Sequence, residues 1–346
     1  MESKNSLLNL KYNIIQAPMA GGIVNPLLVA TVCNAGMLGS IPAGYLSLEL
    51  LQKFIKETKS LTKEPFMVNL FIEKPRKKEQ VFKKANPIIT IEQSLKNTQT
   101  NKNFTVPPTV LEKDYINLLV KEKIPIVSTT FGFLNKSSIK YLKENNIKII
   151  GTATSYEEFT YLVDNGSDAV ILQGFEAGGH QGSFLPTKPN NATTLELLNS
   201  IRKIDKKTII VAAGGIAINN MVDFFKAGAN YIQLGTAFMM VAESNLPTNI
   251  KEYIINKKIT AISKNITGRY ARGIQNKLIK IINDCNKNEI YEFPIQHFHT
   301  SQLRELARQN LNLEYTSVWA GSNQDNLKIQ PINNLILSLQ NKYKTI

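Results

Sequence analysis

The sequence predicts an α/β fold, a (β/α)₈ TIM barrel with an appended, mostly helical subdomain. Short apolar runs rich in β-branched residues alternate with helical patterns, and eight such runs occur before residue 243. Several runs are almost continuously hydrophobic, which is typical of parallel strands covered on both faces. A closed barrel is favoured because an open parallel sheet of eight strands would be large.

The predicted barrel strands are short and apolar, and each is bounded by turn or helix signals. In chain order they are Ile14–Met19, Met37–Ile41, Phe66–Phe71, Ile126–Thr130, Ile147–Gly151, Ala169–Gln173, Thr208–Ala212 and Tyr231–Leu234.

Helix signals lie between these strands. Asn25 followed by Pro26 predicts an N-cap with proline in the first turn, and Gly36 stands where a helix closes in the left-handed conformation. Ser47 precedes an amphipathic repeat that ends before Pro65. A shorter helix over 220–226 leads into the last strand. These helices give the parallel strands the crossover connections that they need.

Two segments do not fit the repeat and define the predicted domains. Residues 1–242 form the barrel, but 73–110 is a long excursion rich in Lys and Asn after the third strand, and one role for it is a lid. Residues 243–311 are mostly helical in pattern, and we expect a subdomain on the substrate side of one barrel mouth. Residues 312–346 are expected to return to the barrel.

The formal net charge of +14 raises the question of a nucleic-acid partner. Only six of the 41 basic residues are arginine, and the lysines are spread along the chain. Because base and phosphate recognition favours arginine with interleaved aromatic residues, we expect a solvated lysine-rich surface and no nucleic-acid partner. No apolar run approaches the ~18 residues of a membrane span, and the start of the chain leads into no signal-peptide core. We therefore expect no membrane partner and a cytoplasmic location.

Cysteine and histidine are scarce. Cys33 and Cys285 are too few for a disulfide framework or a thiolate zinc site, which fits a reducing cytoplasm. His297 and His299 alternate as in an extended segment and resemble a metal pair, but no third ligand lies nearby in the sequence. We expect a surface or interdomain role for them, and no metal site.

Glycine and polar residues gather where the predicted strands end, which is the end of such barrels that carries the chemistry. With their neighbours they are Ala17, Pro18, Met19, Gly21 and Gly22 at and after the end of the first strand, Asn69 in the third, Gln173 to Gly182 at and after the end of the sixth, Gly214 and Gly215 after the seventh, and Gly235 and Thr236 after the eighth. The loops after the last two strands are the usual phosphate-holding pair. The chain has no dinucleotide fingerprint and no P-loop, so a mononucleotide cofactor or a phosphorylated substrate is expected.

His180 is the candidate acid or base at this end of the barrel. Its loop contains Gly178, Gly179 and Gly182, which leave room for a ligand, and loops at this face hold functional residues. Glu176 on the same loop has two alternative roles. It either orients His180 or forms a salt bridge inside the mouth of the barrel.

The ordered set of motifs resembles a known family. It runs through residues 16–22 (QAPMAGG), 151–154 (GTAT), 174–180 (GFEAGGH), 212–216 (AAGGI), 233–238 (QLGTAF), 268–273 (GRYARG) and 319–321 (WAG). Together these are similar to the class I nitronate monooxygenases, formerly called 2-nitropropane dioxygenases, over nearly the whole chain.

The resemblance implies a TIM barrel that holds FMN without a covalent link. It also implies oxidation of alkyl nitronates such as propionate 3-nitronate by dioxygen to a carbonyl compound and nitrite. His180 matches the family's active-site histidine. The implied FMN contacts are Ala17, Pro18, Met19, Asn69, Gln173, Gly178, Gly179, Gly214, Gly215, Gln233, Leu234, Gly235 and Thr236. Two positions depart from the family's pattern. Gln181 stands where related sequences often have arginine, and Tyr270 stands in a stretch where proline is common.

The resemblance also shapes the expected chemistry. A nitronate is already a carbanion equivalent, so His180 need not remove a carbon proton, and we expect it to donate a hydrogen bond to the nitro oxygens. One alternative is an NAD(P)H-dependent FMN reductase of the same superfamily, acting on an enoyl-acyl-carrier protein or a quinone. Another is a nonenzymatic binder of phosphate ligands or nucleic acid. We expect a monomer or a homodimer.

Overall fold

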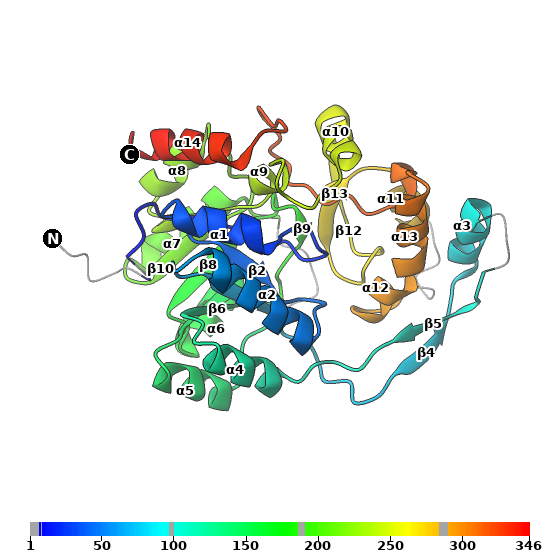
Figure 1. The fold of residues 1–346 in the computed structure, drawn as a ribbon, viewed down its shortest axis with the longest axis horizontal. Helices are drawn as coiled ribbons and strands as arrows, with labels where there is room; N and C mark the ends of the chain where they lie inside the picture. The colour runs from blue at the N-terminus through cyan, green and yellow to red at the C-terminus, as the bar shows by residue number, and fades with distance from the viewer. Residues whose placement is uncertain (1–6, 8, 97–99, 186–190, 284–289) are drawn as a thin grey trace.

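Eight parallel strands form a ring. They lie in the left half of the molecule in Figure 1, beside the yellow and orange helices on the right. The computed structural model describes residue 7 and residues 9–96, 100–185, 191–283 and 290–346. The barrel strands are β1 (Ile14–Gln16), β2 (Ser40–Pro42), β3 (Met67–Phe71), β6 (Ile126–Thr130), β7 (Lys148–Ala153), β8 (Ala169–Gln173), β10 (Ile209–Ala213) and β11 (Tyr231–Leu234). They pair in the order β1-β11-β10-β8-β7-β6-β3-β2, and a parallel bridge between Ile15 and Leu38 joins the two ends. The predicted TIM barrel is confirmed.

All eight predicted strands are present, and their bounds differ by a few residues. The first strand ends at Gln16 instead of Met19. Pro18 has no N–H for a ladder hydrogen bond, and residues 17–19 leave the sheet. The second strand begins at Ser40, after Leu38 has made its bridge to Ile15.

Helices form the outer layer of the barrel, and two of them begin at the predicted caps Asn25 and Ser47. The helices are α1 (Pro26–Asn34), α2 (Leu48–Leu61), α4 (Glu112–Lys121), α5 (Lys136–Glu144), α6 (Tyr156–Asp164), α7 (Thr194–Ile204) and α8 (Met221–Lys226), and the short α9 (Thr236–Met239) follows β11. The Asn25 side chain accepts a hydrogen bond from the Leu28 amide at 2.8 Å, and the Ser47 hydroxyl accepts one from Leu50 at 3.2 Å. Gly36 closes α1 with φ +81°.

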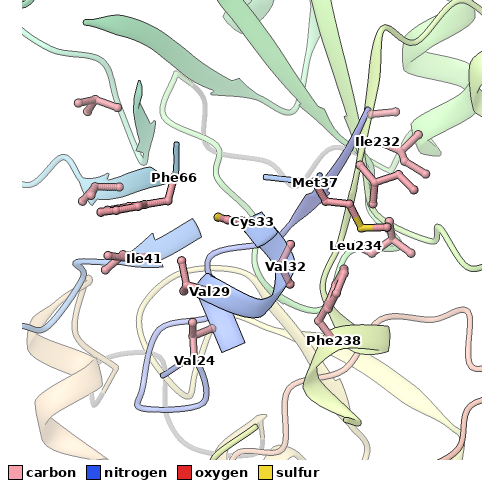
Figure 2. Packing of buried hydrophobic residues seen from close by; sticks show 14 of the residues in the cluster. Val24, Val29, Val32, Cys33, Met37, Ile41, Phe66, Ile232, Leu234 and Phe238 are labelled. Carbon is pink, nitrogen blue, oxygen red and sulfur yellow. The ribbon is translucent and has the colours of Figure 1, made fainter. Parts of the chain in front are cut away.

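The strands alternate between two hydrophobic clusters, one inside the barrel and one between the strands and helices. Tyr231 faces the interior cluster, whereas Ile232 and Leu234 face the outer one. Figure 2 shows part of the outer cluster, in which Leu234 lies with Met37 and Phe238. The alternation places Gln233, between Ile232 and Leu234, on the inner side of the strand.

Residues 243–311 contain helices and a small sheet. The helices are α10 (Thr248–Lys257), α11 (Lys277–Asn283), α12 (Ile295–His299) and α13 (Ser301–Gln309). The strands β12 (Thr260–Ser263) and β13 (Ala271–Ile274) form an antiparallel hairpin, to which β9 (Gly179–His180) adds a third strand. The sequence pattern indicated the helices and missed this sheet. His297 and His299 lie in α12, so the expected extended segment is wrong.

The excursion packs on these helices (Figure 1). It contains β4 (Gln80–Lys83), α3 (Asn86–Lys96) and β5 (Asn103–Val106), with β4 and β5 paired antiparallel. Ile88 and Ile91 of α3 share a hydrophobic cluster with Leu303 of α13. A fully buried ion pair joins Lys84 and Glu92 at 2.6 Å, and Lys84 also donates to Gln302 at 2.6 Å.

The last segment packs on the barrel. After the 3₁₀ helix η2 (Leu313–Tyr315), α14 (Ile332–Tyr343) contributes Leu335 and Leu339 to the outer barrel cluster. The Tyr343 ring lies edge-on to Tyr12 at 5.5 Å. In the part of the chain that the structure describes, no helix combines the length and the apolar character of a membrane span.

Candidate active site

A cavity of about 1250 Å³ opens at the carboxyl ends of the barrel strands. The predicted site residues that line it are Ala17, Pro18, Met19, Asn69, Gln173, Gly178, Gly179, His180, Gly214, Gly215, Gln233, Gly235 and Thr236. Leu234 is the exception, because its side chain faces the outer cluster and its carbonyl accepts a hydrogen bond from Ala17. No described residue of the 73–110 excursion is part of the cavity wall.

His180 is held by contacts with residues distant in the sequence. Its Nε2 atom lies 2.9 Å from the hydroxyl oxygen of Thr267, which follows β12. The rings of Phe131, Phe293 and Trp319 surround the imidazole at centroid distances of 5.6, 5.9 and 5.7 Å. Among the described residues, Nδ1 of His180 has no hydrogen-bond partner. The ring is therefore fixed through Nε2 and offers Nδ1 to a ligand.

This environment keeps His180 neutral. Burial lowers its pKa to about 3, and the charges of Arg269 and Arg304 act in the same direction. A neutral imidazole carries one N–H donor and one acceptor nitrogen. His180 therefore acts here as a hydrogen-bonding group and not as a cation.

Gln173 positions the loop that carries His180. Its Nε2 atom donates to the carbonyl of His180 at 3.1 Å, and its Oε1 atom accepts from the Gly182 amide at 2.7 Å. The sequence predicted a cofactor contact for Gln173. The structure places the residue at the cavity wall but shows both ends of its amide bonded to the loop.

Glu176 does not bond to His180. Its Oε2 atom accepts a hydrogen bond from the Thr194 amide at 3.0 Å, at the start of α7. Among the described residues it forms no ion pair within 4.0 Å, although the charge of nearby Arg272 partly opposes the rise in its pKa caused by burial. Of its two expected roles, the structure supports neither, and Glu176 instead anchors the start of α7.

Glycines line the cavity with open backbone. Gly21, Gly22 and Gly179 have φ of +94°, +86° and +74°, and a β-carbon on any of them would meet no heavy atom within 4 Å beyond its chain neighbours. Gly215 has φ +68°, and its carbonyl accepts hydrogen bonds from Asn220 at 2.9 Å and Asn323 at 3.0 Å. The loop after β10 is thus fixed by side chains from both the barrel and the last segment.

Gln233 and Asn69, two polar side chains in the wall of this cavity, differ in their hydrogen bonding. Gln233 Oε1 is buried and has no hydrogen-bond partner among the described residues. Asn69 is buried and donates to the hydroxyls of Ser128 at 3.0 Å and Thr130 at 3.1 Å. An unpaired buried acceptor is costly, so Gln233 is suited to a ligand that brings a donor.

The sequence analysis missed the wall that the appended helices supply. Arg304 on α13 is buried and lines the cavity, and its Nη2 atom donates to the His297 carbonyl at 2.8 Å. The His297 ring stacks on Tyr45 at 4.4 Å, and Tyr45 has a left-handed backbone with φ +72°. The signal in the sequence was a charged residue on the apolar face of α13, beside Leu303 and Ala307.

His299, the second histidine of α12, joins the excursion to the appended helices. The Nε2 atom of His299 accepts a hydrogen bond from the Ala85 amide at 2.9 Å, and its ring stacks on Phe104 at 4.9 Å. Its expected interdomain position is therefore observed, whereas His297 lies at the cavity. No group of three metal-ligating side chains occurs among the residues that the structure describes.

Comparisons with known proteins point to one family. The family model described as nitronate monooxygenase matches residues 2–342. The chain is 39% identical over 328 residues to a probable nitronate monooxygenase of Staphylococcus saprophyticus, covering 91% of this chain and 90% of that protein. It is 34% identical over 360 residues to a probable nitronate monooxygenase of Staphylococcus aureus, covering 100% and 99%.

Two solved structures are similar to this chain over nearly its whole length. Nitroalkane oxidase from Streptomyces ansochromogenes is similar with a TM-score of 0.82 and 28% identity, covering 97% of this chain and 96% of that one. FabK from Thermotoga maritima is similar with a TM-score of 0.74 and 26% identity, covering 98% and 94%.

Proposed function

The chain belongs to the nitronate monooxygenase family of oxidoreductases, and from this premise we propose that it uses FMN to oxidise alkyl nitronates with dioxygen to a carbonyl compound and nitrite. Propionate 3-nitronate is the example we expect it to accept. The observation that carries the proposal is the position of His180, which faces a glycine-lined cavity at the carboxyl ends of the barrel strands. We also propose that the protein is located in the cytoplasm.

The residues present fit a flavin mononucleotide. The cavity exceeds the ~300–1000 Å³ of a typical small-molecule site, so cofactor and substrate fit together. Open backbone at Gly21, Gly22 and Gly179 allows close approach of a flat ring, and the unpaired Gln233 Oε1 is an acceptor for a ring N–H. We assign the phosphate to the loops at Gly214, Gly215, Gly235 and Thr236, and the ring edge to Ala17, Pro18 and Met19.

His180 is proposed to hold the nitronate group. Bound FMN supplies electron acceptance and the reaction with oxygen. The Thr267 hydroxyl lies 2.9 Å from His180 Nε2 and 3.3 Å from the Arg269 carbonyl, and we assign its single proton to the shorter contact. Nε2 then accepts, the ring proton lies on Nδ1, and Nδ1–H donates to a nitronate oxygen. The surrounding aromatic rings exclude water from this hydrogen bond.

A spectrum and two assays test the proposal. The purified protein should be yellow, with a flavin band near ~450 nm, and should release nitrite from propionate 3-nitronate in air. Rapid anaerobic bleaching by NADH or NADPH, without nitrite release, would instead support the FMN reductase. A colourless protein that still binds polyanions in ~0.2 M salt would support the nonenzymatic binder, because salt weakens nonspecific contacts.

A further inference from the structure

Arg304 carries a buried charge in the cavity wall. The residue is 7% exposed, and its guanidinium donates to the Thr300 hydroxyl at 3.1 Å, the Ser317 hydroxyl at 3.3 Å and the His297 carbonyl at 2.8 Å. All of these acceptors are neutral. Arginine is protonated even here, because burial lowers its pKa only to about 10. A buried charge without a counter-ion is unfavourable.

No carboxylate of the described chain neutralises Arg304. Carboxylates pair with Arg76 and Arg308 among the described residues, and none lies within 4.0 Å of Arg304. Arg269 differs, because Glu73, Glu292 and Glu158 act on it at longer range. Two other side chains act electrostatically on the pKa of Arg304. Tyr45 is a phenol whose own pKa is raised by burial, and Arg308 is a second cation, so neither supplies a counter-ion. The counter-ion of Arg304 is therefore absent from the described protein.

The guanidinium retains capacity for an anion. It has five N–H groups, and contacts with the protein use Nε–H, one hydrogen on Nη1 and those on Nη2. The contacts with Ser317 at 3.3 Å and with His297 Nδ1 at 3.4 Å are long, so a carboxylate can replace them with charge-assisted bonds.

Arg304 and His180 serve the same cavity. Both line it, and the Phe293 ring lies against both His180, at 5.9 Å, and His297, which Arg304 contacts, at 6.5 Å. The positive charge of Arg304 also acts on His180 and contributes to the lowering of its pKa, so the two groups lie near one another in the cavity wall.

We propose that Arg304 is a specificity-determining residue that binds a carboxylate of the substrate while His180 holds the nitronate group. The inference rests on the proposed oxidation of nitronates. Arg304 then selects nitronates that carry a carboxylate over alkyl nitronates of the same length, because only the former supply the missing counter-ion.

The test uses two pairs of compounds that differ in the carboxylate. Turnover is measured with propionate 3-nitronate and propyl nitronate, and binding by calorimetry with 3-nitropropionate and 1-nitropropane. The wild-type protein should prefer the carboxylate in both assays. Arg304→Gln should lower kcat/KM for propionate 3-nitronate by about 100-fold and for propyl nitronate by less than about 3-fold, as expected for loss of a charge-assisted pair. Arg304→Lys should recover part of the difference.

Arg308→Gln is the matched control, because Arg308 lies on the same helix and also lines the cavity, but its charge is already paired with Glu305 at 2.7 Å. It should preserve the preference for the carboxylate. Equal binding of 3-nitropropionate and 1-nitropropane by the wild-type protein overturns the inference even if Arg304→Gln does not fold. If Arg304-dependent binding of 3-nitropropionate is present but neither nitronate is oxidised, the proposed function fails and the carboxylate site stands.

Discussion

The Nε2 atom of His180 lies 2.9 Å from the Thr267 hydroxyl, although 87 positions separate the two residues in the chain. The contact joins the loop after β8 to the segment between β12 and β13, and β9 and β13 pair beside it. The segment that follows barrel strand β8 and the hairpin of β12 and β13 therefore fix the orientation of a single imidazole. The tautomer of His180 depends on this contact.

Thr267→Val should lower kcat on nitronates about 10-fold, less than the loss on removing His180 itself. Valine keeps the shape of threonine and removes the proton that holds Nε2 as an acceptor. Thr267→Ser should restore most of the activity, because it returns the hydroxyl. Steady-state kinetics of the three proteins check this. A valine variant with wild-type kcat would show that the hydroxyl does not position the ring.

His180→Ala and His180→Asn should lower turnover of nitronates by about 10² or more while FMN stays bound. The reason is that Nδ1–H is the donor assigned to the nitronate, whereas the cofactor is assigned to other residues. Nitrite release measures the first effect, and the flavin absorbance of the purified variant measures the second. Near-normal turnover would refute the role of His180.

Gly179→Ala should reduce FMN retention by at least about 10-fold, and Gly166→Ala should not. Both glycines have positive φ, +74° and +90°, so both substitutions cost about 1–2 kcal/mol of backbone strain. Only the new methyl at Gly179 enters open cavity space, whereas at Gly166 it meets Lys143 Nζ at 3.0 Å. The measurement is the FMN content of each purified variant. The unfolding free energies of the two variants are measured as well, so that FMN content is compared between proteins of equal stability. Equal FMN content would place the cofactor elsewhere.

The free energy of unfolding should fall as the pH is lowered below about 6.5. Burial lowers the pKa of His299 to about 4, with the charge of Lys84 acting in the same direction. Its unfolded pKa is about 6.5, so the unfolded chain binds more protons between these values and acid favours it. The expected loss at about pH 5.5 is roughly 1 kcal/mol for this histidine.

Urea unfolding at about pH 8 and about pH 5.5 measures this loss. His299→Gln is the control, because glutamine offers an acceptor to the Ala85 amide without titrating. Its stability should depend less on pH than that of the wild type. An unchanged slope would mean that His299 does not contribute.

The barrel and most of the cavity wall could be predicted from the sequence, because the signals for them lie within short stretches of the chain. Strands such as Ala169–Gln173 have apolar residues and flanking turns within a few positions, and the residues after each strand must meet at one end of the ring. Leu234 shows the limit of reasoning by motif. It belongs to the same motif as Gln233, but the alternation of the strand turns its side chain to the other face.

The wall formed by Arg304 and His297 could not be predicted in the same way. Its position depends on how α12 and α13 pack across the barrel mouth, which involves contacts between distant segments such as Ala85 with His299. The pairing of β9 with β13 depends equally on long-range register. Only the buried charge on the apolar face of α13 gave a local sign of function.

The excursion supports α13, and α13 carries Arg304. Most of the cavity wall therefore comes from the barrel, whereas the helix that carries Arg304 packs on an insertion that follows β3. Because different stretches of the chain support these two parts of the wall, we expect amino-acid changes in the insertion to alter substrate choice without disturbing the proposed cofactor site. Amino-acid differences among relatives should therefore concentrate in residues 73–110 and in α13, the helix on which they pack.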